Sequence, residues 1–130
     1  MTNGAFKIIG WVLSILFGIF MIGASVAPKL LGNPVAQETM VGLGWDDSPL
    51  VLIGVLELLC TLLYLLPATG LLGASLMMAI LGGAMATHIR AHSPLPLYTL
   101  FPIYLGIVMW AGLWLRDWRV RGVWPLRRTE

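Results

Sequence analysis

Charged side chains are scarce in this chain, and long stretches of it have none. Asp, Glu, Lys and Arg make up 11% of its 130 residues, whereas soluble domains carry about 25%. Hydrophobic residues make up 58%, and the mean hydropathy is +0.88. A soluble domain needs a polar surface that this composition does not supply. We therefore expect an integral membrane protein.

Cysteine and the motifs of common cofactor sites are also scarce. The single Cys60 excludes a disulfide within the chain. The sequence contains no zinc-binding pattern, phosphate-binding loop or dinucleotide-binding fingerprint. His88 and His92 share no helical face at a depth that suits a buried haem. No metal site is predicted, and the identity of any cofactor stays open.

Four apolar stretches have the length that a membrane helix needs. A hydrocarbon core of about 30 Å takes about 20 helical residues, with a lower limit near 17. Backbone polar groups must pair within each segment in lipid, which favours helices. We predict an all-α, integral membrane four-helix bundle over residues 1–115, followed by a basic tail at 116–130. The four stretches are 8–27, 50–66, 68–87 and 95–115.

Basic residues favour one orientation of this bundle. Lys7 precedes the first stretch, and five arginines follow the fourth: Arg116, Arg119, Arg121, Arg127 and Arg128. The positive-inside rule therefore places both termini in the cytoplasm. The arginines fit an anchor to the lipid bilayer better than nucleic-acid binding, and no nucleic-acid partner is expected.

The longest loop, residues 28–48, then lies on the outer face. It carries the acids Glu38, Asp46 and Asp47. Asn33 is placed to cap a short interfacial helix over 35–41. Two interpretations stay open, because the loop could cover the mouth of the bundle as a lid or serve as a plain connector.

Small residues at four-residue spacing predict two packing faces. They are Gly10, Ser14 and Gly18 on the first helix, and Ser75, Ala79, Gly83 and Thr87 on the third. Small side chains let helix backbones approach closely in lipid. We expect the third helix to be the central packing element, although its glycines could instead leave room for a ligand.

A single carboxylate interrupts the second apolar stretch. Glu57 shares a helical face with Cys60, Thr61 and Tyr64. Because a charge at the bilayer centre costs about 2.5–3.5 kcal/mol on insertion scales, this polar stripe should face the bundle or a partner subunit. Counting helical rise places the phenol of Tyr104 at the same depth. Glu57 could exchange protons in a polar pocket, or clip two helices through a hydrogen bond worth about 0.6 kcal/mol.

Polar residues also gather at the end of the third stretch. Thr87, His88 and Arg90 emerge there, on the same face of the membrane as Lys29. They predict a cationic mouth above Glu57 that would attract an anionic headgroup or substrate, or stabilise developing negative charge. Contact of His88 and Arg90 with the helix dipole and with lipid headgroups is the simpler alternative.

Three short motifs follow one another along the chain: "APKLLGNP" (27–34), "LIGVLELL" (52–59) and "GGAMATHIR" (82–90). In this order and spacing they resemble the DoxX-like family of small four-helix membrane proteins. The resemblance runs over roughly residues 8–115, and the family's polar positions fall on Lys29, Glu57, His88 and Arg90. It implies a bacterial cytoplasmic (inner) membrane and a link to redox chemistry. In some members that link is to quinone-dependent sulfur oxidation.

Two hypotheses for function follow. In the first, the bundle binds a lipophilic small molecule, with a quinone as one candidate; Glu57, His88 and Arg90 would act catalytically, and Lys29, Thr87 and Tyr104 would bind the ligand. In the second, the chain is a non-catalytic membrane subunit or assembly factor, whose polar residues clip helices and bind a second copy or a redox partner protein. Whether the protein is an enzyme stays open. A proton-coupled transporter would need an oligomer, since four helices are few.

Overall fold

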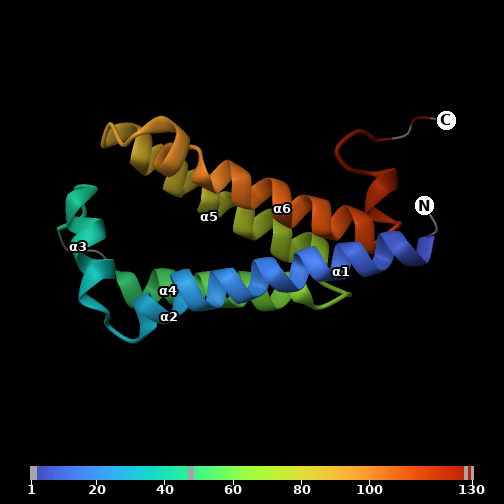
Figure 1. The fold of residues 1–130 in the computed structure, drawn as a ribbon, viewed down its shortest axis with the longest axis horizontal. Helices are drawn as coiled ribbons and strands as arrows, with labels where there is room; N and C mark the ends of the chain where they lie inside the picture. Colours follow the sequence, from blue (N-terminus) through green and yellow to red (C-terminus); the bar gives the residue numbers. More distant parts are fainter. Residues whose placement is uncertain (1–2, 47–48, 128, 130) are drawn as a thin grey trace.

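The computed structural model describes residues 3–46, 49–127 and 129. Over these residues the chain forms helices and connecting turns without a strand, so the all-α prediction is confirmed (Figure 1). Residues 47 and 48 of the predicted outer loop, with the predicted acid Asp47, lie outside the described residues. So do residues 128 and 130 of the predicted tail.

The first helical segment contains an irregular turn. Helix α1 (Asn3–Phe20) continues through a π-helical turn (Met21–Val26) into the short helix α2 (Ala27–Leu30). A π turn holds one residue more than an α turn and so changes which side chains share a face beyond it. Ser25 lies within this turn and Lys29 lies in α2.

Four further helices follow within the part of the chain that the structure describes. Helix α3 (Pro34–Gly42) begins as predicted, because the Asn33 side chain accepts a hydrogen bond of 2.9 Å from the backbone N–H of Val35. The others are α4 (Leu50–Leu65), α5 (Gly70–Arg90) and α6 (Phe101–Arg116). A π-helical turn over Leu95–Thr99 precedes α6, and a short 3₁₀ turn over Val120–Gly122 follows it.

Within the described ranges, three helical segments are long and apolar enough to cross a membrane: Asn3–Leu30, Gly70–Arg90 and Leu95–Arg116. Helix α4 is as apolar but has 16 residues, which span about 24 Å at 1.5 Å per residue. It therefore falls just short of the length predicted for a fourth span. The apolar helices indicate an integral membrane protein.

The helices form two layers that diverge at one end (Figure 1). Helices α1 and α4 lie in one layer and α5 and α6 in the other, with α1 packed along α6 and α4 along α5. The layers are close together at the end that carries both chain termini, here called the terminal end. They separate toward the opposite end, here called the α3 end (Figure 1). Fully buried side chains of Phe17, Tyr64, Met77, Met109 and Leu113 form the core.

The predicted packing face is confirmed on α1 but not on α5. Gly10, Ser14 and Gly18 of α1 are buried, as expected. On α5 the prediction is wrong, because Ser75, Ala79 and Gly83 are exposed. The buried face of α5 instead holds Gly70, Gly73, Ala74, Met77 and Leu81. Residues spaced strictly by four drift about 40° around a helix at each step, whereas alternating steps of three and four stay on one face.

Candidate functional site

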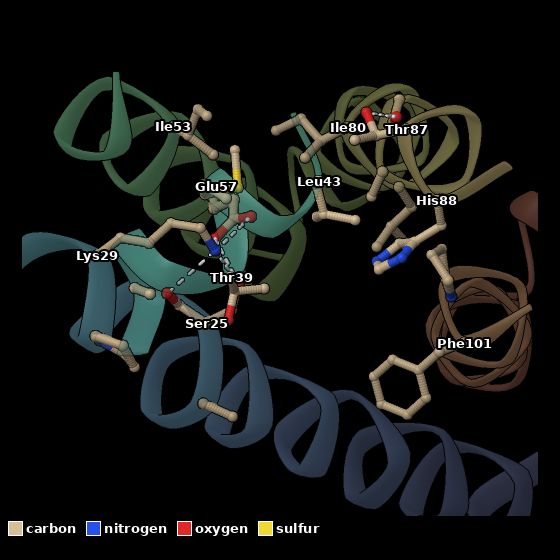
Figure 2. Close-up of a pocket in the computed structure, with 18 of the residues that line it drawn as sticks. Ser25, Lys29, Thr39, Leu43, Ile53, Glu57, Ile80, Thr87, His88 and Phe101 are labelled. Atoms are coloured by element: carbon tan, nitrogen blue, oxygen red, sulfur yellow. Dashed lines mark hydrogen bonds and ion pairs between the residues drawn. The ribbon is translucent and has the colours of Figure 1, made fainter. Parts of the chain in front are cut away.

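A cavity of about 620 Å³ lies between the two layers toward the α3 end, and Figure 2 shows its lining. This size falls within the range of small-molecule sites. Apolar side chains form much of its wall, among them Phe20, Leu56, Ile80, Phe101 and Leu105. The polar residues that line it are Ser25, Lys29, Asn33, Thr39, Glu57, Thr87, His88 and Tyr98.

Glu57 lies in the wall of this cavity and pairs with Lys29. The Glu57 residue is 6% exposed, and the Lys29 ammonium lies 3.2 Å from its Oε2 and 3.3 Å from its Oε1. The hydroxyl of Ser25 donates to the same Oε2 over 2.8 Å and accepts from Lys29 over 2.7 Å. The predicted polar stripe of α4 therefore does face the interior, and its carboxylate is neutralised by the first helical segment.

The rest of that stripe lies deeper in the bundle. Cys60, Thr61 and Tyr64 are all buried. Thr61 donates its hydroxyl to the backbone carbonyl of Glu57 over 2.8 Å, and so has no hydrogen to offer a ligand. Of the polar side chains on this face of α4, Glu57 is the one that reaches the cavity.

His88 enters the cavity from α5, across from Glu57 (Figure 2). Its Nδ1 lies 3.0 Å from the Ser93 hydroxyl. Its ring stacks on that of Tyr98 with centroids 6.2 Å apart. These contacts fix the orientation of the imidazole. Across the described part of the chain, Nε2 has no hydrogen-bond partner and is available to a ligand.

The other predicted site residues divide into two groups. Thr87 lines the cavity, and its hydroxyl donates to the Gly83 carbonyl over 2.9 Å. Arg90 and Tyr104 do not line it. Tyr104 is 44% exposed, because α6 turns Phe101 and Leu105 toward the cavity instead. The depth estimate gave the level of Tyr104 along its helix but not its direction.

Arg90 contacts the loop after α3 rather than the cavity. Its guanidinium donates to the backbone carbonyl of Leu43 over 3.1 Å. It also lies against Gly44, which has a φ of +89° that favours glycine. Thr39, Met40, Leu43 and Trp45, in and after α3, line the cavity. The loop is therefore part of the cavity wall rather than a plain connector, and Arg90 fastens it to the end of α5.

Sequence reasoning missed the role of Ser25 and the direct contact between Lys29 and Glu57. A signal was present, because Ser25 precedes Lys29 by four residues and so shares its face of a helix. Lys29 was placed only at the mouth, since the sequence does not show that its long side chain turns inward along α4.

A second buried polar cluster, at the terminal end, was also missed. Arg116 is 8% exposed and donates to the backbone carbonyl of Tyr64. Its guanidinium lies 4.4 Å from the ring centre of Trp11 and 4.6 Å from that of Tyr64. The Tyr64 hydroxyl donates to the Met109 carbonyl over 2.7 Å and lies 3.0 Å from the Ser14 hydroxyl. Arg116 is thus a buried part of the bundle, at the position where the sequence predicts that the basic tail begins.

The segment after Arg116 also folds back on the bundle. Val120 is buried, and the indole of Trp124 stacks on that of Trp110 with centroids 4.3 Å apart. Arg121 donates to the backbone carbonyls of Trp114 and Leu115, both over 2.9 Å. These contacts satisfy carbonyl groups at the end of α6.

Comparison with protein families matches most of the chain. A family model described as the DoxX-like family covers residues 12–112. That range includes every residue that lines the cavity. Neither the curated proteins nor the solved structures contain a match to this sequence.

Proposed function

Since the chain belongs to the DoxX-like family, we propose that it binds a lipophilic small molecule in the cavity at the α3 end. We also propose that Glu57 exchanges a proton with this molecule. The position of the carboxylate is the main support. Glu57 is buried, yet it lines a cavity whose other walls are mostly apolar. Buried acids in such cavities are common proton-transfer groups.

The contacts of Glu57 suggest how the exchange would run. A ligand hydroxyl that reaches the carboxylate would pass its proton to Glu57 and become an oxyanion. Lys29, which then no longer faces a carboxylate, would stabilise the new negative charge on the ligand oxygen. His88 would hold the polar group of the ligand from the opposite wall. Arg90 would act through the position of α3, without touching the ligand.

A quinone is one candidate ligand and would make the protein a quinone-linked redox component or a membrane enzyme. Its ring suits an apolar cavity, and its carbonyl oxygens take up protons when it is reduced. Glu57 and His88 both line the cavity; the Glu57 carboxylate would first take up a proton from water and then pass it to the quinone, and His88 would supply the other. The electrons would come from a redox partner protein.

The ion pair also supports a second candidate, a non-catalytic membrane subunit. Lys29 and Ser25 belong to the first helical segment and Glu57 belongs to α4. Their contacts hold these helices together whether or not a ligand is present. In this alternative the exposed small residues of α5 would meet a second copy or a partner protein.

The orientation belongs to the same proposal. We place the terminal end, with Lys7 and the arginines that follow α6, in the cytoplasm of a bacterium. The α3 end then faces the outer side of the inner membrane. A reporter that is active only in the cytoplasm should be active when fused to the C-terminus. An inactive fusion on a folded, membrane-inserted protein contradicts this orientation.

Filling the cavity tests the proposed binding directly. Ala84 lines the cavity on α5, whereas Ala79 on the same helix is exposed and does not line it. Native mass spectrometry of protein released from its own membrane should show a bound small molecule in the wild type and in Ala79→Phe. Ala84→Phe should lose most of it. Equal occupancy in both variants, or none in the wild type, would count against the binding function and favour the subunit alternative.

A further inference from the structure

We infer that the cavity selects lipophilic molecules whose polar group is uncharged, such as an alcohol or a ketone, over those with a carboxylate or an ammonium group. This inference rests on the proposed function, because it names the class of ligand that the same cavity would take. This inference differs from the prediction made from the sequence, in which a cationic mouth attracts an anionic ligand.

The Lys29 ammonium has no hydrogen left for an anion. It carries three N–H bonds. They are matched by the Ser25 hydroxyl at 2.7 Å, the Ser25 carbonyl at 3.3 Å and the Glu57 carboxylate at 3.2 Å. An anionic ligand would have to displace one of these acceptors while lying beside the negative charge of Glu57.

The pair as a whole adds no net charge to the cavity wall. Glu57 and Lys29 carry opposite formal charges and lie in contact. Among the described residues that line the cavity, Glu57 is the acid and Lys29 is the base. The other titratable side chains there are His88 and Tyr98. The other predicted cation, Arg90, points to the Leu43 carbonyl and does not line the cavity. An extra charge buried beside this neutral pair would lack a partner, which is unfavourable.

An uncharged polar group can still be bound. A carboxylate offers about four lone-pair positions, and Glu57 Oε1 accepts one long bond of 3.3 Å, from Lys29. A ligand hydroxyl can therefore donate to Oε1. A ligand carbonyl can accept from His88, whose Nδ1 contacts Ser93 and whose other ring nitrogen is available. The apolar body of the ligand would lie along Ile80, Phe101 and Leu105.

A set of probes that differ only in the polar group tests this inference. Dodecanol, laurate and dodecylamine are titrated at pH 8.0 into the full chain in phosphatidylcholine nanodiscs, with empty nanodiscs as the reference. Binding is followed by the rise in melting temperature. The Kd of dodecanol should be at least about tenfold lower than that of either charged probe. Equal affinities, or tightest binding of laurate or dodecylamine, overturn the inference while leaving the binding function in place. If none of the three binds, the binding function itself fails.

Two charge variants sharpen the test. Glu57→Gln leaves the Lys29 charge uncompensated and should shift the preference toward laurate. Lys29→Gln should shift it toward dodecylamine. Glu38→Gln, on the exposed face of α3 and away from the cavity, should keep the wild-type order. If either single variant fails to fold, Lys29→Gln/Glu57→Gln restores an uncharged pair and should keep the preference for dodecanol. Unchanged preferences in folded single variants contradict the inference.

Discussion

The two ends of the bundle each hold a cation between helices, and they do so in different ways. At the α3 end, Lys29 pairs with Glu57 beside a cavity. At the terminal end, Arg116 lies between the rings of Trp11 and Tyr64 and binds a backbone carbonyl, without a carboxylate at ion-pair distance in the described chain. An ammonium is a compact, strongly hydrated charge, whereas a planar guanidinium stacks on aromatic rings. The cation at the terminal end is therefore a packing element, whereas the pair at the α3 end lies in the wall of a cavity.

Glycines show the same contrast. At the terminal end a Cβ on Gly73 would overlap the backbone of Tyr64, and one on Gly112 would lie 2.8 Å from the Tyr64 hydroxyl. Toward the α3 end a Cβ on Gly23, Gly82 or Gly83 would meet no atom within 4 Å. Helix backbones therefore approach closely at the terminal end, whereas Gly83 toward the other end lines the cavity.

Substitution of these glycines should give the largest effect on stability. Gly73→Leu places a side chain into the backbone of α4, and we expect it to cost about 3 kcal/mol or more, as severe overpacking does. Gly82→Leu is the matched control on the same helix and should change the melting temperature in detergent little. Similar losses in both variants would remove the difference between the two ends.

Replacement of Arg116 should have the next largest effect. Arg116→Met keeps much of the volume but loses the hydrogen bond to the Tyr64 carbonyl and both ring contacts, at a cost of about 2–3 kcal/mol. Arg116→Lys should not restore stability, because an ammonium cannot stack on two rings. Arg119→Lys, at an exposed position, is the control in the same thermal unfolding assay. Full stability of Arg116→Lys would show that only the charge matters at this end.

Replacement of Glu57 should have a smaller effect on stability and a larger one on function. Glu57→Leu removes three hydrogen bonds from Lys29 and Ser25 and should cost about 1–2 kcal/mol, because the cavity lets solvent reach Lys29. Glu57→Gln keeps the shape and should unfold near the wild-type temperature while losing the ligand-dependent proton exchange. That exchange is read with a pH-indicator dye in weakly buffered nanodiscs. A fully active Glu57→Gln protein would leave the helix clip as the better account of this residue.

Much of the fold could be predicted from the sequence, because apolar length and helical periodicity are local properties. The helices, the Asn33 cap and the inward face of α4 all follow from such patterns. The buried face of α5 could not be predicted in the same way. Two faces of that helix hold small residues, and only the packing partner decides which one is buried.

The candidate site was predictable in its residue types but not in its contacts. Glu57, His88, Thr87 and Lys29 do meet at one cavity. Arg90 was assigned to it because it emerges with His88 at the end of the third stretch, but a helix separates residues two apart by about 200°. Arg116 was misplaced for a different reason. The sequence predicts that it begins a basic tail that anchors to lipid headgroups, whereas its burial depends on the aromatic rings of two distant helices.

The π-helical turn at Met21–Val26 sets the direction, around the helix axis, of the side chains that follow it in the first helical segment. Its additional residue shifts the angular position of Lys29 by about 100° relative to an uninterrupted α-helix. In a regular helix the ammonium would therefore not have the direction that it now has toward Glu57. The ion pair therefore depends on the number of residues before Lys29 as well as on the two charges. A one-residue deletion at Gly23, where no side chain would be lost, would compensate for the turn, because a regular α-helix one residue shorter holds Lys29 in the same direction.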